Sequence, residues 1–487
     1  MKPSLRILFS CMLILFFFHQ LPAQDIDKTK AEIIKQLDKK IDHYDQVAHQ
    51  IWGFAEMGYQ EHKSTELLQQ TLKTAGFTIN AGVADMPTAF VASWGSGKPI
   101  IGILAEFDAL PGLAQEAVPE RKAIEGQKAG HACGHHLFGT GSTAAAIAVK
   151  NWLEESGTQG TIRLYGTPAE EGGGGKVYMV REGLFDDVDA VINWHPGSGN
   201  TASARSSLAV RGIKFQFHGK ASHAAGSPER GRSALDGVEA FTTMVNLMRE
   251  HVPDATRIHY IISRGGEAPN VVPAFAEVVL RIRHPDVQMV KSIYDRMVLA
   301  AKGAAMGTGT TMTQEIYMGY YNLLPNEPLA EKMYKNLQLV GGVTYNEEER
   351  QFAEKIIPTF DKKGLAPEMS QEIEEYSVNY VGRGGSTDVG DISWQVPTAG
   401  MSGATWVPGT SAHSWQAVAA GGTSIGTKGM MVAAKTMALS AIDLYKDHSI
   451  IEKAKAKLNE LRGKDFKYES LVGDRKPPLD YRSHLTN

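Results

Sequence analysis

Apolar residues along the chain follow two patterns that alternate. Short, mostly apolar runs, Pro99–Leu104, Thr161–Tyr165 and Val188–Trp194, predict strands that are buried on both faces. Longer stretches with helical periodicity separate these runs, among them the small-residue stretch Leu137–Leu153. Strands that alternate with helices are typical of an α/β domain. We therefore predict a domain whose mostly parallel mixed sheet is flanked by helices.

A different pattern begins at Ala209, where alternating apolar residues predict a strand. The expected order of elements from there is strand, helix, strand, strand, helix and strand, which describes an α+β unit of roughly 110 residues. The expected ranges are Ala209–His218, Arg232–His251, Arg257–Ser263, Glu277–Arg283, Asp286–Met306 and Thr310–Met318. We interpret 209–322 as an α+β lid inserted into the main domain, 24–208 and 323–449. The charged tail, 450–487, is expected to start as a helix at Ile450 and to end in a Pro- and Lys-containing stretch that is surface or mobile.

The first 23 residues have the pattern of a secretory signal peptide. Lys2 and Arg6 precede the apolar run Ile7–Phe18, which is too short to span a bilayer, and cleavage is expected near Ala23. We therefore predict an exported protein, periplasmic or secreted, with no membrane span after cleavage. A retained anchor or a lipoprotein at Cys11 is the alternative, although Cys11 lies inside the apolar run.

The composition is that of an ordinary globular enzyme. Charged residues make up 21% of the chain and the net charge is −4 at pH 7. Because there is no basic excess, no nucleic acid partner is expected. The length of 487 residues favours two domains.

A thiol and three imidazoles lie within six residues, in His131-Ala132-Cys133-Gly134-His135-His136. Such side chains suit a borderline-soft metal such as zinc, manganese or cobalt. In an extended loop, Cys133 and His135 point to the same side and can reach one metal. A helix-entry loop that happens to hold histidines is the alternative. Once the signal is removed Cys133 is the only cysteine, so no internal disulfide is available.

Acidic residues or a histidine follow the end of each predicted strand, where open α/β sheets bind ligands. Asp108 follows the first strand, Glu170 and Glu171 follow the second, and His195 ends the third. Adjacent carboxylates face apart, so one can hold a metal while the other addresses a water molecule. A solvated acidic turn is the alternative, but Gly172–Gly175 lets the backbone approach closely, which favours a site.

These motifs and others further along the chain resemble one enzyme family. The motifs are Glu106-Phe107-Asp108-Ala109-Leu110, Cys133-Gly134-His135, Glu170-Glu171-Gly172, Trp194-His195-Pro196, Ser222-His223-Ala224-Ala225, Pro269-Asn270-Val271-Val272-Pro273, Arg283-His284-Pro285, Ser386-Thr387-Asp388 and His413-Ser414-Trp415. Their order and spacing resemble the dinuclear metallo-amidohydrolases that include aminoacylases, glutamate carboxypeptidases and auxin-conjugate hydrolases. The resemblance is strongest to the branch of the p-aminobenzoyl-glutamate hydrolase large subunit.

The resemblance implies two divalent metal ions per subunit, zinc, manganese or cobalt, in the main domain, which would then be catalytic. It implies that Cys133 bridges them as a thiolate, with the ligand set completed by His135, Glu171, His195 and His413. Glu170 would be the general base and acid, which takes a proton from the attacking water and passes it to the leaving amine. Asp108 would orient a ligand or tune that base.

The resemblance also implies substrate contacts from the lid and from one loop. His223, Asn270 and Arg283 would grip the substrate carboxylate and the developing oxyanion, with Arg281 as a competitor of Arg283. Gly385 and Ser386 would line the substrate pocket. Lids of this kind pair into a homodimer, and a second related subunit is a further possible partner.

Two positions depart from the family pattern. Glu106 stands where the wider superfamily has a metal-binding histidine, and His136 stands where relatives often carry an acid or an amide.

The predicted function is hydrolysis of the amide bond of an N-acyl or N-aroyl amino acid with a free carboxylate, such as a p-aminobenzoyl-glutamate-like conjugate. The alternatives are a dipeptidase or aminoacylase of the same family, or a non-catalytic ligand-binding subunit, against which the presence of Glu170 argues. A purely structural metal site is disfavoured, because such sites take ligands close together in sequence, whereas these are spread over about 280 residues.

Overall fold

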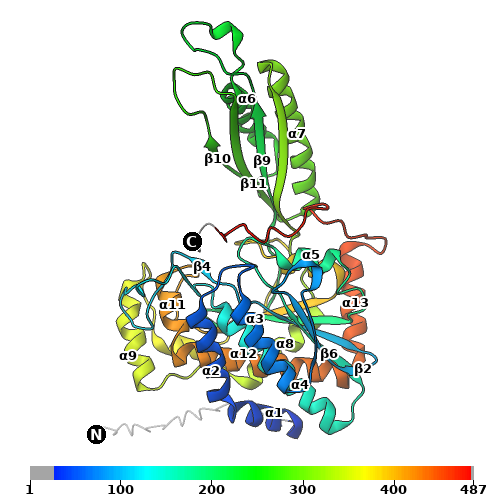
Figure 1. Ribbon diagram of the computed structural model, residues 1–487. Coiled ribbons are helices and arrows are strands. Elements are labelled where there is room, and N and C mark those ends of the chain that lie inside the picture. Colours follow the sequence, from blue (N-terminus) through cyan, green and yellow to red (C-terminus); the bar gives the residue numbers. More distant parts are fainter. Residues whose placement is uncertain (1–26, 484–487) are drawn as a thin grey trace, which may run out of the picture.

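The computed structural model describes residues 27–483 and shows a large α/β domain from which a smaller lid projects (Figure 1). The predicted signal peptide and Cys11 lie outside the described residues. The large sheet has the strand order β1-β2-β6-β3-β7-β14, with β6, β3, β7 and β14 parallel and β1 and β2 antiparallel. The bounds are β1 Thr78–Ala81, β2 Phe90–Ser96, β3 Ile100–Ala105, β6 Gly160–Gly166, β7 Ala190–Gly197 and β14 Thr398–Ala404. The predicted fold class is confirmed.

The central strand β3 is buried at all six positions because helices cover both faces of the sheet. Ile101 and Ile103 belong to the core formed with α4 (His135–Ser156) and α12 (Ser424–Lys446). Leu104 belongs to the core on the other face, with residues of α5 (Gly175–Arg181) and α10 (Val389–Gln395). The small residues of α4 let it approach closely: a Cβ on Gly139 would lie 2.8 Å from the carbonyl oxygen of Glu106. Residue size therefore brings the start of α4 to the end of β3.

The remaining elements of the large domain are helices around the sheet and two short ladders. The helices are α1 Lys28–Asp38, α2 Ile41–Phe54, α3 His62–Thr74, α8 Glu327–Val340, α9 Glu347–Ile356, α11 Trp415–Gly421 and α13 His448–Arg462. The ladders pair β4 Leu110–Pro111 with β5 Ala129–Gly130, and β8 Ala204–Arg205 with β13 Val378–Asn379. Within residues 27–483, no helix combines the length and apolar character needed to cross a membrane.

The lid has the element order that the sequence predicts. Its antiparallel sheet has the order β10-β11-β9-β12, and α6 and α7 pack on one face of it. The bounds are β9 Ala209–His218, α6 Ala234–Met248, β10 Arg257–Arg264, β11 Phe275–His284, α7 Val287–Thr308 and β12 Thr311–Tyr320. Strand β9 starts beside the large domain and ends toward the tip of the lid (Figure 1). Ten residues of strand span roughly 33 Å, so the tip lies far from the large sheet.

The helix expected from Ile450 corresponds to α13, but the end of the chain after it differs from the expectation of a surface or mobile stretch. Residues beyond α13 cross between the lid and the large domain, drawn in red in Figure 1. Leu471 and Val472 are buried, and Arg211 of β9 donates a hydrogen bond of 3.0 Å to the Leu471 carbonyl. Leu471 fits there because Gly319 leaves room: a Cβ on Gly319 would lie 2.6 Å from that of Leu471. The expectation is wrong because isolated apolar residues in a charged segment give no periodic signal.

Candidate metal centre

The candidate site lies at the carboxyl ends of β3, β6 and β7, at the start of α4. Glu106 and Asp108 follow β3, Glu170 and Glu171 follow β6, and His195 lies two residues before the end of β7. Parallel strands deliver these side chains to one edge of the sheet.

Cys133 and His135 reach this edge through a turn, not through the extended loop that the sequence suggested. Gly134 has φ 73° and caps α4, which begins at His135. Glycine adopts this left-handed conformation without steric cost. A Cβ on Gly134 would also lie 2.6 Å from the Cβ of Pro196, so no larger residue fits.

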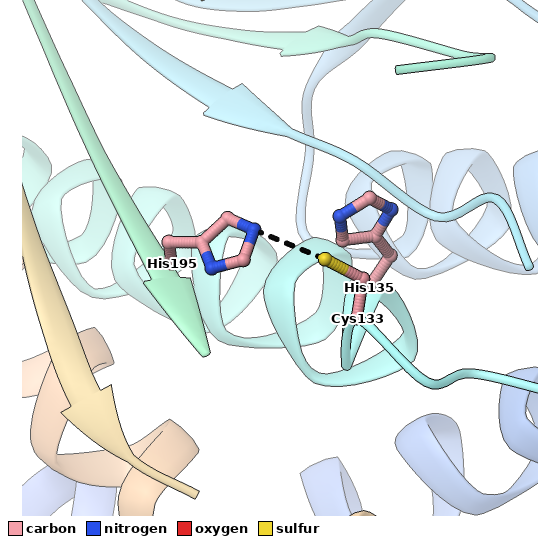
Figure 2. A group of neighbouring side chains, drawn as sticks. All are labelled: Cys133, His135 and His195. Atoms are coloured by element: carbon pink, nitrogen blue, oxygen red, sulfur yellow. Dashed lines mark hydrogen bonds between the residues drawn. The ribbon is translucent and has the colours of Figure 1, made fainter. Parts of the chain in front are cut away.

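Two groups of ligand atoms share the Cys133 thiol. One is Cys133, His135 and His195, and the other is Cys133, Glu171 and His413; within each group the ligand atoms lie within 4.8 Å of one another. Figure 2 shows Cys133 between the two imidazoles of the first group, with its Sγ 3.5 Å from Nε2 of His195. His413 Nε2 lies 2.9 Å from Glu171 Oε1. A thiol common to both groups is the geometry expected for a thiolate that bridges two metal ions.

The donor set fits two such ions. Nε2 of His135 and Oε1 of Glu171 are buried without hydrogen-bond geometry, and each lies beside another acidic or imidazole group, Glu106 and His413 respectively. A thiol, imidazoles and a carboxylate suit zinc, manganese or cobalt. The structure thus brings all five predicted ligands together, and their role as ligands stays a prediction.

The Asp108 carboxylate contacts one predicted ligand of each group, His135 and Glu171. Its Oδ1 lies 2.8 Å from Nδ1 of His135, and its Oδ2 accepts a hydrogen bond of 2.9 Å from the Glu171 backbone N–H. Burial opposes its charge, yet the neighbouring His135 lowers the pKa of Asp108 to about 2. A carboxylate that binds the far nitrogen of a histidine fixes the orientation of the ring for a metal.

Burial sets the protonation of the other ligands. It raises the pKa of the Cys133 thiol, with His135 opposing, and it lowers the pKa of His195 to about 4. His195 is therefore neutral near pH 7, as a metal-binding imidazole must be. Burial opposes charge on His135 too, but Cys133, Asp108 and Glu106 raise its pKa well above the usual value. A bound metal cation would replace that proton and hold Cys133 as a thiolate.

Glu170 lies at the wall of the same cavity, outside both Cys133 groups, and forms with Glu106 and His135 a third group whose ligand-type atoms lie within 4.8 Å of one another. Burial, followed by repulsion from Glu106, Glu171 and Asp388, raises its pKa well above the usual value. A carboxyl group with a raised pKa can both accept and return a proton near neutral pH.

Two residues of the site have left-handed backbone conformations that are unusual outside glycine. Ala169, directly before Glu170, has φ 57°, and His413 has φ 60°. Such conformations cost about 1 kcal/mol or more and persist where the surroundings impose them, often at functional sites. Backbone hydrogen bonds hold both residues in place: the Ala169 N–H donates to Glu61 at 2.8 Å, and the His413 N–H donates to the Ala132 carbonyl at 2.9 Å.

Sequence reasoning missed Lys176, which is completely buried beside the site. Its Nζ lies 2.7 Å from Glu106 Oε1 and 2.6 Å from Asp388 Oδ1. Burial opposes the charge, but Asp388 and Glu106 raise the pKa of Lys176 above its usual value. Glu106, which departs from the family pattern, is thus partner to a lysine and also lies 3.1 Å from His135 Nε2. The only signal in the sequence is the position of Lys176 after four glycines.

Two histidines of the motif do not join the metal groups. The rings of His131 and His136 pack on each other with centroids 4.9 Å apart. Nε2 of His131 is 3.0 Å from the Ile51 carbonyl oxygen, and Nε2 of His136 is 3.0 Å from that of Gly421. Burial lowers the pKa of both. These two rings support the loop that carries Cys133.

The cavity in front of the metal groups has a volume of about 490 Å³. Gly385 and Ser386 line it, and their role in substrate binding stays a prediction. The Ser386 hydroxyl is buried without a hydrogen bond. Other parts of the wall are apolar, with Leu323, Leu324 and Met401 among them. The cavity can therefore take an apolar group and a polar one together.

The predicted lid residues fall into two places. Arg283 lies at the base of the lid, where it pairs with Val210 near the start of β9. His223 and Asn270 lie together near the tip, where the Ala224 N–H donates to the Asn270 carbonyl at 3.1 Å. Among the described residues, neither His223 nor Asn270 lines the cavity of its own chain.

Comparison with known proteins agrees with this geometry. Residues 102–419 match the model of peptidase family M20/M25/M40. The chain is 41% identical over 450 residues to one of the subunits of p-aminobenzoyl-glutamate hydrolase from Escherichia coli K12, covering 86% of this chain and 94% of that one. It is 28% identical over 446 residues to the Xaa-Arg dipeptidase of Mus musculus, covering 88% and 92%.

Among solved structures, the YXEP protein of Bacillus subtilis, described as a dinuclear metal-binding peptidase of the M20 family, has the same fold. Its TM-score is 0.55 at 16% identity, and the match covers 85% of this chain and 99% of that one.

The fold and the site define a metal-dependent hydrolase of amide bonds. The chain belongs to peptidase family M20/M25/M40, which confirms the resemblance and the enzyme class predicted from the motifs.

Proposed function

We propose that the protein hydrolyses the amide bond of an N-aroyl or N-acyl glutamate, a conjugate of the p-aminobenzoyl-glutamate type. The observation that carries the proposal is the position of Glu170 beside two ligand groups that share Cys133. The apolar part of the cavity wall suits an aromatic acyl group, and Arg283 at the base of the lid suits a carboxylate. The name of the Escherichia coli relative supports this substrate class.

Two divalent ions, zinc, manganese or cobalt, would be held by Cys133, His135, Glu171, His195 and His413. When bound, they would polarise the amide carbonyl and make water more acidic. Glu170 takes a proton from the attacking water and returns it to the nitrogen of the leaving amine. Asp108 holds His135 and the Glu171 backbone in place during this transfer.

A dipeptidase is the second candidate, which the mouse relative supports. A dipeptide substrate would still use Glu170 and the five ligands. An Xaa-Arg substrate would bring a cationic side chain toward Arg283 and Arg383, which is electrostatically unfavourable. A non-catalytic ligand-binding subunit is the third candidate, and Glu170 argues against it.

The test is hydrolysis by the purified protein without residues 1–23, supplied with manganese or zinc. We expect release of glutamate from p-aminobenzoyl-L-glutamate and at least about tenfold slower release from its α-carboxamide analogue, because a charge-assisted hydrogen bond is lost. Equal rates for the two compounds would contradict the need for a carboxylate. Cleavage of dipeptides alone would favour the second candidate.

We further propose that the chain is exported and cleaved near Ala23, that it forms a homodimer through the lid, and that a second related subunit can accompany it. The relatives in Escherichia coli support the second subunit, because two different subunits of p-aminobenzoyl-glutamate hydrolase are both similar to this chain. Cell fractionation with sequencing of the mature N-terminus tests the export, and elemental analysis of the purified protein identifies the metal.

A further inference from the structure

Basic side chains gather on the open face of the lid sheet, at its base. Arg257 and His259 lie on β10 and Arg281 and Arg283 on β11, and the register sets Arg257 opposite Arg283 and His259 opposite Arg281. Residues two apart on a strand share a face, and so do residues directly opposite on neighbouring strands. All four side chains therefore point away from the helix-covered face. Like charges placed opposite each other destabilise a sheet, so the fold itself gains nothing from this arrangement.

These four residues line a hollow of about 870 Å³, and Arg383 of the glycine-rich loop lines it too. No carboxylate lines this hollow within residues 27–483. Glu277 and Glu315 share the sheet face but are already engaged: Glu277 accepts from Gln216 and Ser263, and Glu315 is paired with Lys214 and Arg475. The hollow thus concentrates positive charge that the described residues do not neutralise.

The guanidinium groups of Arg281, Arg283 and Arg383 have N–H donors that are available to a ligand. Arg283 is half-buried and, among the described residues, has no hydrogen bond or ion pair, and its pKa is lowered by burial and by Arg281. Arg281 uses its Nε to donate to the Tyr317 hydroxyl at 3.1 Å, which leaves its two terminal nitrogens available. Arg383 is exposed on its loop. Guanidinium groups with free terminal nitrogens bind carboxylates in a bidentate manner.

One residue of the glycine-rich loop links the hollow to the cavity in front of the metal groups. Arg383 lines both the hollow and the 490 Å³ cavity, and Gly385 and Ser386 of the same loop line that cavity. A ligand whose amide lies beside Glu170 can therefore extend past Arg383 into the hollow.

We propose that this basic hollow is a subsite for a second carboxylate of the substrate, the side-chain carboxylate of a dicarboxylic amino acid, bound by Arg281 and Arg383 while Arg283 holds the α-carboxylate. The inference rests on the proposed function and deepens it, because it makes the glutamate part, and not the acyl group, the feature that the protein selects by charge. A neutral amino acid of the same size leaves two guanidinium groups unpaired.

The experiment measures binding, so that it does not depend on turnover. The metal-loaded Glu170→Gln protein is titrated calorimetrically with p-aminobenzoyl-L-glutamate and with p-aminobenzoyl-L-glutamine, which has the same shape and a neutral side chain. We expect the glutamate compound to bind at least about tenfold more tightly, because its side-chain carboxylate makes charge-assisted hydrogen bonds. Arg281→Gln and Arg383→Gln, each added to Glu170→Gln, should each remove most of this difference while changing the affinity for the glutamine compound little.

The control is Lys302→Gln, which removes one positive charge from α7, on the helix-covered side of the lid. It should keep the full preference for glutamate, which separates a local subsite from the overall charge of the lid. Both arginines are exposed, so their substitution leaves the core of the lid intact.

The outcomes separate the inference from the proposed function. Equal affinity for the two compounds, or a preference that survives in both arginine variants, contradicts the subsite even where wild-type protein hydrolyses p-aminobenzoyl-L-glutamate. A preference that depends on Arg281 and Arg383 supports the subsite, and if the wild-type protein then fails to hydrolyse the compound, the proposed function alone is wrong. Failure to bind either compound contradicts both.

Discussion

At the scale of single residues, the metal centre depends on how the backbone turns between Cys133 and His135. Gly134 makes this turn with φ 73° against Pro196, so the thiol and the imidazole of a short segment meet His195 from a separate strand. Glu170 and Glu171 are neighbours in sequence but differ in surroundings, since His413 lies beside Glu171 and lowers its pKa against the effect of burial, whereas burial raises that of Glu170. Adjacent carboxylates can therefore have different tasks.

Substitution separates these tasks. Glu170→Gln should abolish turnover while leaving the metal content near that of the wild type, because Glu170 lies outside both groups that share Cys133. Cys133→Ser should lower metal content and activity together, because a hydroxyl is a much poorer ligand than a thiolate for such ions. Elemental analysis beside a rate assay checks both. Equal metal loss in the two variants would show that the roles of Glu170 and the ligands have been exchanged.

Lys176 offers a prediction about stability at the same scale. Lys176→Met leaves Glu106 and Asp388 buried without their cation, which should destabilise the protein by roughly 3–5 kcal/mol. Thermal unfolding measures the loss. Lys122→Met is the matched control, because Lys122 pairs with Glu116 at the surface, and it should unfold as the wild type does. A wild-type midpoint for Lys176→Met would mean that the neighbouring carboxyl groups hold protons instead of depending on the lysine.

At the scale of elements, Asp391 joins three segments that are distant in the chain. It lies in α10, accepts a hydrogen bond of 3.0 Å from the Tyr321 N–H just after β12, and lies 2.6 Å from the Tyr468 hydroxyl of the tail. The carboxyl group therefore ties the exit of the lid and the tail to the helix beside the substrate loop. The tail also contacts the site itself, since Arg482 donates to the Glu171 carbonyl.

Asp391 should make stability depend on pH. Burial raises its pKa to about 7 in the folded protein, against a usual value of 3.8. The folded state thus binds a proton that the unfolded state releases, so this contribution is full below about pH 4 and is lost as the pH rises through about 7. Asp391→Asn removes the titration, so the wild type should lose stability relative to the variant between pH 4 and 8. Unfolding midpoints of both proteins across this range check it, and parallel curves would contradict the shift.

At the scale of the whole molecule, residue types and periodicity predict the order of elements. The reason is that the parallel strands are buried on both faces, and buried and more exposed residues alternate along the lid strands. Chemistry at strand ends was enough to bring Asp108, Glu170 and Glu171 together. The sequence did not reveal what depends on long-range packing: the burial of Lys176 against Asp388, 212 positions away, or Leu471 against Gly319. Neither contact leaves a periodic or local trace.

The length of the lid separates Arg283 from the other two predicted substrate-binding residues, His223 and Asn270, which the motifs alone could not show. Arg283 lies at the base of the lid, whereas His223 and Asn270 lie near the other end of β9 and β11, roughly 30 Å away along the strands. His223 is exposed there, and its Nδ1 accepts hydrogen bonds from the Ala225 and Gly226 N–H groups. If the proposed homodimer forms through the lids, these two residues are free to serve the site of the partner.

Mixing two inactive variants tests this directly. We predict that Glu170→Gln and His223→Ala are each inactive alone, and that co-expression restores activity. In a mixed dimer one site lacks both groups, while the other combines an intact Glu170 with an intact His223 from its partner. Half of the dimers are mixed under random pairing and each has one active site, so about a quarter of wild-type activity should return. Rates measured on dimers purified through two different tags should reach about half, because only mixed dimers are kept. If His223 served its own chain, both sites of every mixed dimer would be inactive and neither preparation would recover activity. Full activity of a monomer would also contradict the exchange of His223 between subunits.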